Sequence, residues 1–267
     1  MTAAFGAHDV AVVRGAPRTA DADVALVAAK LAALRVGGRA ELNLTQPLST
    51  AAFSRRDSLL PGYASAQDAV LARGFSPVIR PVGGHLAVYD AGALVLHLWA
   101  PHPEARVQIR HRFELFGAAV VQGLRRLGVD ARLGPVPGEY CDGEFSVNDS
   151  GRAKLVGTGQ RITGAGFLFS AVVMVQDAGP AREALTAAYA SLGLTFDPRT
   201  VGCVADRVPG VTSEEVCEEL IAALGGVVPL MPAAGETLPR PTYGVQPTSQ
   251  VRRRSGTWPL ASTSMRT

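Results

Sequence analysis

Helix-like and strand-like segments follow one another without regular alternation in this chain of 267 residues, and that order limits its fold more than any other feature. A long helix-like stretch at 107–128 is followed by three short strand-like stretches before the apolar run 166–175. Regular alternation is typical of a doubly wound parallel sheet, whereas grouped strands favour the α+β class. We therefore predict an α+β protein with a mixed or antiparallel sheet and flanking helices.

Capping and turn residues mark several element ends. Ser65 and Asp68 have the spacing of a capping box and predict a helix that ends at Gly74. Thr212 and Glu215 have the same spacing and predict the start of another helix. The predicted helices cover 21–35, 65–74, 107–128, 180–192 and 213–224; the predicted strands cover 41–44, 130–133, 144–148, 153–158 and 166–175, with short pieces between 77 and 99.

The composition changes near Val228. Before that point the chain is rich in hydrophobic residues, which make up 47% of the whole and suffice for one good core. After it, Pro, Ser, Thr and Arg dominate and hydrophobic periodicity is lost, which is typical of disorder. We expect one folded domain over residues 1–228 and a disordered tail over residues 229–267.

The net charge of +3 belongs to the tail. Five arginines and no acid lie in residues 240–267, so removing them from the +3 leaves −2 for residues 1–239. Nucleic-acid-binding domains carry a basic stripe on the folded part, and this chain does not. We therefore expect no nucleic-acid partner.

Apolar runs and cysteines point to a soluble, cytoplasmic protein. The runs 91–100 and 167–175 are too short to cross a bilayer, and the N-terminal segment lacks the features of a signal peptide. Cys141, Cys203 and Cys217 are irregularly spaced and indicate neither a disulfide framework nor a metal site. We expect reduced thiols, no membrane partner and no bound metal.

Lysine is nearly absent from the chain. Only Lys30 and Lys154 occur among 26 basic residues, and the other 24 are arginine. Arginine cannot imitate a compact amine, so a surviving lysine is a candidate for chemistry. Lys30 lies in a helix-like run and is expected to face solvent, which leaves Lys154 as the candidate; chance survival under a compositional bias is the alternative.

Cys141 lies in a polar, loop-like stretch, unlike a buried structural thiol. A nearby ammonium acidifies a thiol because it favours the thiolate, which is the nucleophile. Thirteen residues and one predicted strand separate Cys141 from Lys154, so a hairpin could bring them together. An ordinary loop cysteine is the alternative, and Cys217, in the middle of a predicted helix, is expected in the core.

A second candidate segment contains the pair Gly83-Gly84. Glycines between short strands let the backbone approach a ligand and offer bare N–H groups to an anion or carbonyl. Arg80 nearby could bind a carboxylate or phosphate with two hydrogen bonds. An ordinary hairpin turn is the alternative reading, and the usual phosphate-binding glycine motifs are absent from the sequence.

Together the two segments resemble the biotin/lipoate protein ligase A/B superfamily, and the likeness runs from about residue 21 to 226. The family's ligand loop, Arg-Arg-x-x-Gly-Gly-Gly-Ala-Val-x-His-Asp, is similar to this chain at Arg80, Gly83, Gly84 and Asp90. Its lysine loop, Lys-x-x-Gly-x-x-Gln-Arg, is similar at Lys154, Gly157, Gln160 and Arg161. The resemblance implies a lipoate ligase/acyltransferase-like catalytic domain whose lysine contacts the acyl carbonyl or the acyl-adenylate phosphate.

A third likeness narrows the choice. Tyr140-Cys141-x-Gly143-Glu144-Phe145 is similar to the Tyr-Cys-Pro-Gly-Asp-Tyr segment of the octanoyltransferase and lipoyl-amidotransferase branch. It implies that an octanoyl or lipoyl group forms a thioester on Cys141, assisted by Lys154, and moves to a lysine of a lipoyl-domain protein. No cofactor is needed. The implied partners are the glycine-cleavage H protein, the acyltransferase subunits of 2-oxoacid dehydrogenases, and acyl carrier protein.

Four positions depart from the family pattern. Ile79 replaces the first arginine, His85 the third glycine and Asp142 the proline, and Ser170 stands where relatives carry Gln or a His-Gly pair. Two alternatives therefore stay open: an ATP-dependent lipoate–protein ligase that uses ATP and Mg and forms a lipoyl-adenylate, and a non-catalytic acyl-binding paralogue. The expected substrate-binding residues are Arg80, Gly83, Gly84, His85, Gly157, Gln160 and Ser170, with Val88, Leu96 and Phe167 as candidates for the acyl-chain wall.

Overall fold

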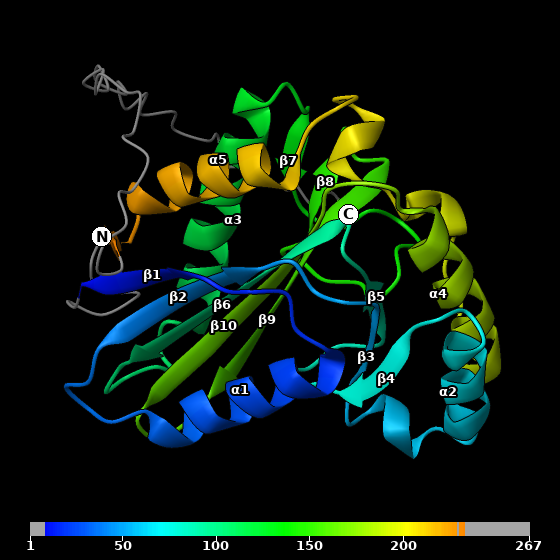
Figure 1. Ribbon diagram of the computed structural model, residues 1–267, viewed down its shortest axis with the longest axis horizontal. Coiled ribbons are helices and arrows are strands. Elements are labelled where there is room, and N and C mark those ends of the chain that lie inside the picture. The colour runs from blue at the N-terminus through cyan, green and yellow to red at the C-terminus, as the bar shows by residue number, and fades with distance from the viewer. Residues whose placement is uncertain (1–8, 229, 233–267) are drawn as a thin grey trace, which may run out of the picture.

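The computed structural model describes residues 9–228 and 230–232 and contains an eight-stranded mixed sheet (Figure 1). Its strand order is β11-β1-β2-β6-β10-β9-β8-β7. Strand β1 pairs in parallel with both neighbours, and the other pairs are antiparallel, so the predicted mixed sheet is confirmed. The strands are β1 (Val10–Arg14), β2 (Ala40–Thr45), β6 (Ala93–Pro101), β7 (Ala131–Leu133), β8 (Val147–Asp149), β9 (Ala153–Ile162), β10 (Gly166–Met174) and β11 (Leu230–Pro232).

A three-stranded sheet forms a second, smaller layer. Its order is β4-β3-β5, in which β3 pairs in parallel with β4 and antiparallel with β5. The strands are β3 (Thr50–Phe53), β4 (Ser76–Ile79) and β5 (Ala87–Tyr89). Buried residues of both strands and helices, among them Phe53, Val70 and Leu185, join this sheet to the two helices beside it in one hydrophobic cluster.

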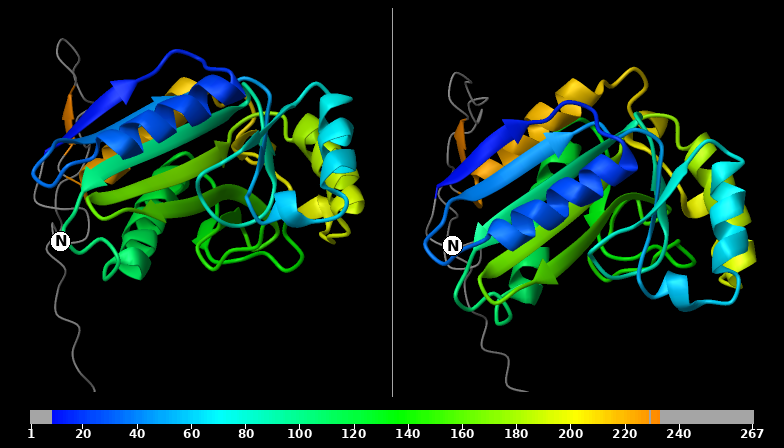
Figure 2. Two further views of the ribbon diagram at one scale, coloured as in Figure 1. Left: turned by 90° about the horizontal axis from the view of Figure 1, so that it is seen from below. Right: turned by 60° about the horizontal axis from the view of Figure 1, so that its bottom comes forward.

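Five α-helices in the described part of the chain cover the sheets. The helix α1 crosses one face of the large sheet, and α3 and α5 cover the opposite face (Figure 2). The helices α2 and α4 pack against each other beside the small sheet (Figure 1). The helices are α1 (Ala20–Ala33), α2 (Tyr63–Leu71), α3 (Ile109–Arg126), α4 (Gly179–Leu192) and α5 (Ser213–Gly225).

The predicted helices all form, but α2 begins before its predicted capping box. Thr212 and Glu215 do form the predicted box at the start of α5. Ser65, in contrast, lies inside α2, which begins at Tyr63 with Gly62 as its N-cap. A Cβ on Gly62 would lie 1.7 Å from the Ser191 main-chain oxygen of α4, so close packing between the two helices sets this helix start.

The N- and C-terminal strands were not predicted from the sequence. Strand β11 extends the large sheet beyond the boundary expected at residue 228. The rest of the expected tail, residue 229 and residues 233–267, lies outside the described residues.

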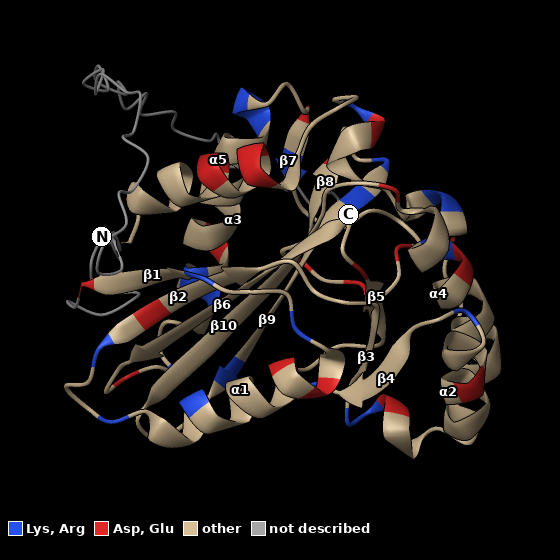
Figure 3. Cartoon of the chain, in the orientation of Figure 1, with Lys and Arg blue, Asp and Glu red and all other residues tan. Residues whose placement is uncertain are grey.

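In the part of the chain that is described, no helix has the length and apolar character needed to cross a membrane. Figure 3 shows acidic and basic residues interspersed along the helices and loops around a largely uncharged central sheet.

Candidate active site

A cavity of about 360 Å³ contains most of the residues selected from the sequence. Its apolar wall combines α1 with both sheets and includes Val24, Val78, Val88, Val95 and Val172. Its polar lining includes Cys141, Lys154, Arg80 and the Gly83-Gly84 pair, together with Gly157, Gln160 and Ser170. An apolar cavity with a few convergent polar groups is the usual form of a small-molecule site.

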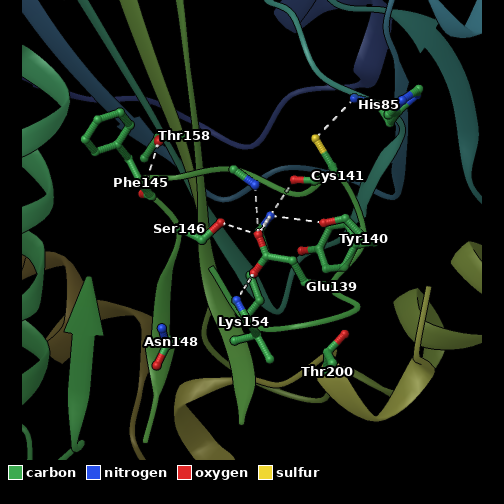
Figure 4. A network of polar contacts seen from close by, with 12 residues as sticks. His85, Glu139, Tyr140, Cys141, Phe145, Ser146, Asn148, Lys154, Thr158 and Thr200 are labelled. Atoms are coloured by element: carbon green, nitrogen blue, oxygen red, sulfur yellow. Dashed lines mark hydrogen bonds and ion pairs between the residues drawn. The ribbon is translucent and has the colours of Figure 1, made fainter. Parts of the chain in front are cut away.

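The two sequence segments meet at the sulfur of Cys141. Its Sγ accepts a hydrogen bond from the His85 main-chain N–H at 3.2 Å (Figure 4). It accepts another from Arg80 Nη2 at 3.4 Å. A Cβ on Gly84 would lie 2.7 Å from this sulfur, and Gly84 has a φ of +95°, so the turn requires glycine. Both donors therefore point at the atom that would act as the nucleophile.

Lys154 lies close to Cys141, as the hairpin argument predicted, but it does not contact the sulfur. Its buried ammonium donates to Cys141 O at 2.8 Å, to Tyr140 O at 3.1 Å and to Glu139 Oε1 at 3.1 Å. An ammonium has three protons, so all its donors are in use. Lys154 therefore holds the main chain on which the thiol is carried.

Glu139 is a site residue that the sequence did not reveal. Its buried carboxylate accepts from the Val136 and Gly143 N–H groups and from the Ser146 hydroxyl, in addition to Lys154. Figure 4 shows these bonds converging beneath the cysteine loop. Glu139 lies 15 residues before Lys154, and this spacing belongs to no sequence motif. An acidic partner could have been suggested only by an expectation that Lys154 is buried, since a buried ammonium needs one.

His85 contributes its main chain to the site, not its ring. The ring points away from Cys141 in Figure 4, and its Nδ1–H donates to Asp57 Oδ1 at 2.7 Å. The Asp57 side chain is fully buried.

Tyr189 is another neighbour of the cysteine loop. Its hydroxyl accepts a hydrogen bond from the Cys141 N–H at 2.8 Å and donates one to Leu86 O at 3.2 Å. The sequence offered no signal for Tyr189 as a neighbour of the thiol.

Other predicted residues line the cavity with their polar groups already paired. Gln160 accepts from Arg112 Nε at 2.8 Å and donates to Ile109 O at 3.0 Å, which ties β9 to α3. Gly157 lies against Lys154, because a Cβ added to it would be 3.5 Å from the lysine Cε. A side chain at Gly157 would therefore enter the space beside the ammonium.

A polar cluster forms another part of the cavity wall. Ser170 Oγ is 2.9 Å from His97 Nδ1, and His97 Nε2 is 3.0 Å from Asp23 Oδ2. Burial acts to raise the pKa of Asp23, but the hydrogen bond from His97 and the charges of His97 and Arg18 outweigh it and lower the pKa. Asp23 is thus held as a carboxylate inside the cavity.

Part of the expected acyl wall is wrong. Val88 lines the cavity, but Leu96 and Phe167 belong to the core on the opposite face of the large sheet, beneath α3 and α5. Successive side chains of a strand point to opposite faces of the sheet, so one strand can contribute residues both to the cavity and to the core on the other face.

The other two cysteines, Cys203 and Cys217, are buried away from the cavity. Burial raises the pKa of both thiols, that of Cys217 to about 11.

Comparison with known proteins places the chain in one family of catalytic domains. Over residues 63–225 the chain matches the family described as the lipoyl protein ligase A/B catalytic domain, and it belongs to that family. Among solved structures it is similar to a lipoate-protein ligase A bound with ATP, with a TM-score of 0.66 and 18% identity over 85% of this chain and 87% of that one. It is also similar to a bipartite lipoate protein ligase from Thermoplasma acidophilum, with a TM-score of 0.64 and 18% identity over 85% of each chain.

Two curated relatives share part of the sequence. An octanoyl-[GcvH]:protein N-octanoyltransferase of Exiguobacterium sibiricum is 32% identical over 137 residues, which are 51% of this chain and 49% of that protein. A protein of the same name from another Exiguobacterium strain is 27% identical over 139 residues, 52% of this chain and 49% of its own length. The chain thus spans about half the length of these relatives.

Proposed function

We propose that this protein transfers an octanoyl or lipoyl group to a lysine of a lipoyl-domain protein through a thioester on Cys141. The observation that carries the proposal is the position of the Cys141 sulfur, on the wall of an apolar cavity and within hydrogen-bonding distance of two donors. The name of the partly matching relatives, an octanoyl-[GcvH] transferase, agrees with this chemistry. The cavity falls within the range of roughly 300–1,000 Å³ usual for small-molecule sites.

In the first step the Cys141 thiolate attacks the carbonyl carbon of an acyl group carried as a thioester or amide. A carbon–sulfur bond forms, and the carbonyl electron pair becomes an oxyanion. The intermediate then collapses, the bond to the carrier breaks, and the carrier's thiol or amine leaves with the proton that Cys141 gave up. The His85 N–H and the Arg80 guanidinium are the donors placed to stabilise the oxyanion.

Arg80 has a further donor for this purpose. Its Nε–H is buried and has no acceptor within the described residues, although the side chain lines the cavity. A buried donor without an acceptor costs free energy, and an acyl oxygen could satisfy it. Lys154 supports the same step indirectly, because it fixes the Cys141 carbonyl.

In the second step the amine of an acceptor lysine attacks the thioester carbon. An amide bond forms, the carbon–sulfur bond breaks, and the proton that the amine loses passes to the departing Cys141 sulfur, which returns the enzyme to its starting state. No ATP, metal or redox partner enters this balance. We propose the glycine-cleavage H protein and the acyltransferase subunits of 2-oxoacid dehydrogenases as lipoyl-domain partners, and acyl carrier protein as a donor.

The proposal is tested by intact-protein mass spectrometry without ATP. The protein is mixed with octanoyl-loaded acyl carrier protein or octanoyl-loaded H protein and quenched in acid. The expected result is an adduct of one octanoyl group that hydroxylamine removes, that Cys141→Ala lacks, and that Cys203→Ala retains. Full transfer by Cys141→Ala would disprove the covalent route.

The alternatives give different results in the same assay. A lipoate–protein ligase modifies the acceptor only with ATP, Mg and free lipoate, and it does not need Cys141. A non-catalytic paralogue binds the acyl group and modifies nothing under either condition.

A further inference from the structure

Two side chains outside the proposed chemistry hold the turn that supplies a donor to the thiol. The turn is Gly83–Leu86, here called the 83–86 turn. On one side, the buried carboxylate of Asp57 accepts from the His85 ring at 2.7 Å and from the Ser54 N–H at 2.8 Å. Since Ser54 directly follows β3, Asp57 anchors the 83–86 turn to the end of that strand.

On the other side, Tyr189 of α4 joins the turn to the cysteine loop. Its hydroxyl donates to Leu86 O and accepts from the Cys141 N–H, so one oxygen bridges both segments. Burial raises the pKa of Tyr189, and the hydroxyl therefore keeps the proton that it donates.

The turn itself has little intrinsic rigidity. It contains two adjacent glycines, and glycine has more backbone freedom than any other residue. The distance of 3.2 Å between His85 N and Cys141 Sγ depends on where that backbone lies. A displacement of one ångström is enough to remove a hydrogen bond and to cost about 10²-fold in rate.

We propose that Asp57 and Tyr189 are positioning residues that hold the His85 N–H on the Cys141 sulfur and on the oxyanion formed beside it. Asp57 acts through the 83–86 turn, whereas Tyr189 acts through that turn and through the Cys141 main chain. Neither side chain is hydrogen-bonded to the sulfur among the described residues. The catalytic meaning of this assignment rests on the proposed function, whereas the effect on thiol reactivity does not.

Tyr189→Phe tests the geometry without changing any charge. The rate of Cys141 alkylation by iodoacetamide at pH 7 is measured by peptide mass spectrometry, because only the thiolate reacts. We expect a loss of about tenfold, which corresponds to about 1.4 kcal/mol of weakened hydrogen bonding. Tyr63→Phe is the matched control, since its hydroxyl makes no hydrogen bond within the described residues, and we expect an unchanged rate.

Asp57→Ala separates positioning from electrostatics by the sign of the effect. Removal of a nearby negative charge would by itself favour the thiolate and speed alkylation. Loss of the positioned N–H slows it, and we expect a decrease of about tenfold. Asp68→Ala is the control variant, because it removes an exposed acid from the neighbouring helix α2.

Each outcome decides the proposal. Slower alkylation in both variants, with kcat for octanoyl transfer lowered about tenfold and KM within about twofold, supports it. An unchanged rate in Tyr189→Phe, or a faster rate in Asp57→Ala, overturns it. If Asp57→Ala does not fold, as judged by circular dichroism, His85→Ala replaces it, because that variant removes the anchored ring and retains the N–H. If alkylation slows but the unmodified protein never forms an acyl adduct, the positioning role stands and the proposed function fails.

Discussion

Replacement of Lys154 by Met tests whether the cysteine loop depends on one buried ammonium. Met has nearly the same length and no charge, so the change removes three hydrogen bonds with little change in volume. It leaves the Glu139 carboxylate buried without its cation. Breaking a buried ion pair by removing one partner typically costs about 3–5 kcal/mol.

The structure places the expected cost at the low end of that range. Glu139 keeps three other donors, from Val136, Gly143 and Ser146. The Cys141 carbonyl borders the cavity, where water can replace the ammonium, but the Tyr140 carbonyl is more enclosed. We expect a decrease in the free energy of unfolding of about 3 kcal/mol, which corresponds to a fall in Tm of roughly 6–12 °C for a domain of this size.

Urea denaturation with a second substitution gives the measurement. In the Lys154→Met background, Glu139→Gln removes the unpaired charge and should recover about 1–2 kcal/mol, which a double-mutant cycle reports as coupling. Lys30→Met is the control, because the Lys30–Glu41 pair is partly exposed and should contribute less than about 1 kcal/mol. A loss below about 1 kcal/mol in Lys154→Met, or no recovery in the double variant, would refute the reasoning.

Three further predictions concern the same region. Gly84→Ala should destabilise the fold by about 1–2 kcal/mol through its positive φ, and it should lower the acylation rate more than tenfold because the new Cβ displaces the Cys141 sulfur. Gly62→Ala should cost about 3 kcal/mol in thermal melts, since its Cβ would force α2 away from α4. Asp23 has a lowered pKa, so its contribution to stability is present above its ordinary pKa of about 3.9 and is lost as the pH falls through the lower, folded value. The stability advantage over Asp23→Asn should therefore shrink as the pH falls below about 4 in urea titrations. An advantage that is constant with pH would contradict this last prediction.

The fold class and most elements could be predicted because each depends on local pattern. The capping box of α5 and the helix predicted over 107–128 follow from residues three or four positions apart, and both are confirmed. The start of α2 could not be predicted in this way, because it depends on the close approach of Gly62 to a residue 129 positions later. Strand β1 was missed for a similar reason, since its partners β2 and β11 lie far apart in the sequence.

The residues of the candidate site likewise differ in whether local sequence pattern or long-range packing places them. Cys141, Lys154 and the glycine pair stand in motifs whose spacing is visible in the sequence, and the structure brings them into one cavity. Tyr189 is not marked by any such spacing, because it contacts the cysteine loop through a hydrogen bond that long-range packing creates. A sequence therefore reveals the groups that carry chemistry more readily than the groups that orient them.

The geometry around Lys154 explains why this position retains lysine in a chain of arginines. Its three acceptors, Glu139 Oε1 and the carbonyls of Tyr140 and Cys141, converge on one point at 2.8–3.1 Å. The three protons of an ammonium can radiate from one nitrogen to such a set, whereas the guanidinium of arginine is flat, larger and donates in a fork. The lysine side chain is only 2% exposed and packs against Gly157, so a larger head group at this position would displace its neighbours. The rarity of lysine was thus a useful signal, but the compact amine it marked serves first to fix the loop that carries the Cys141 thiol.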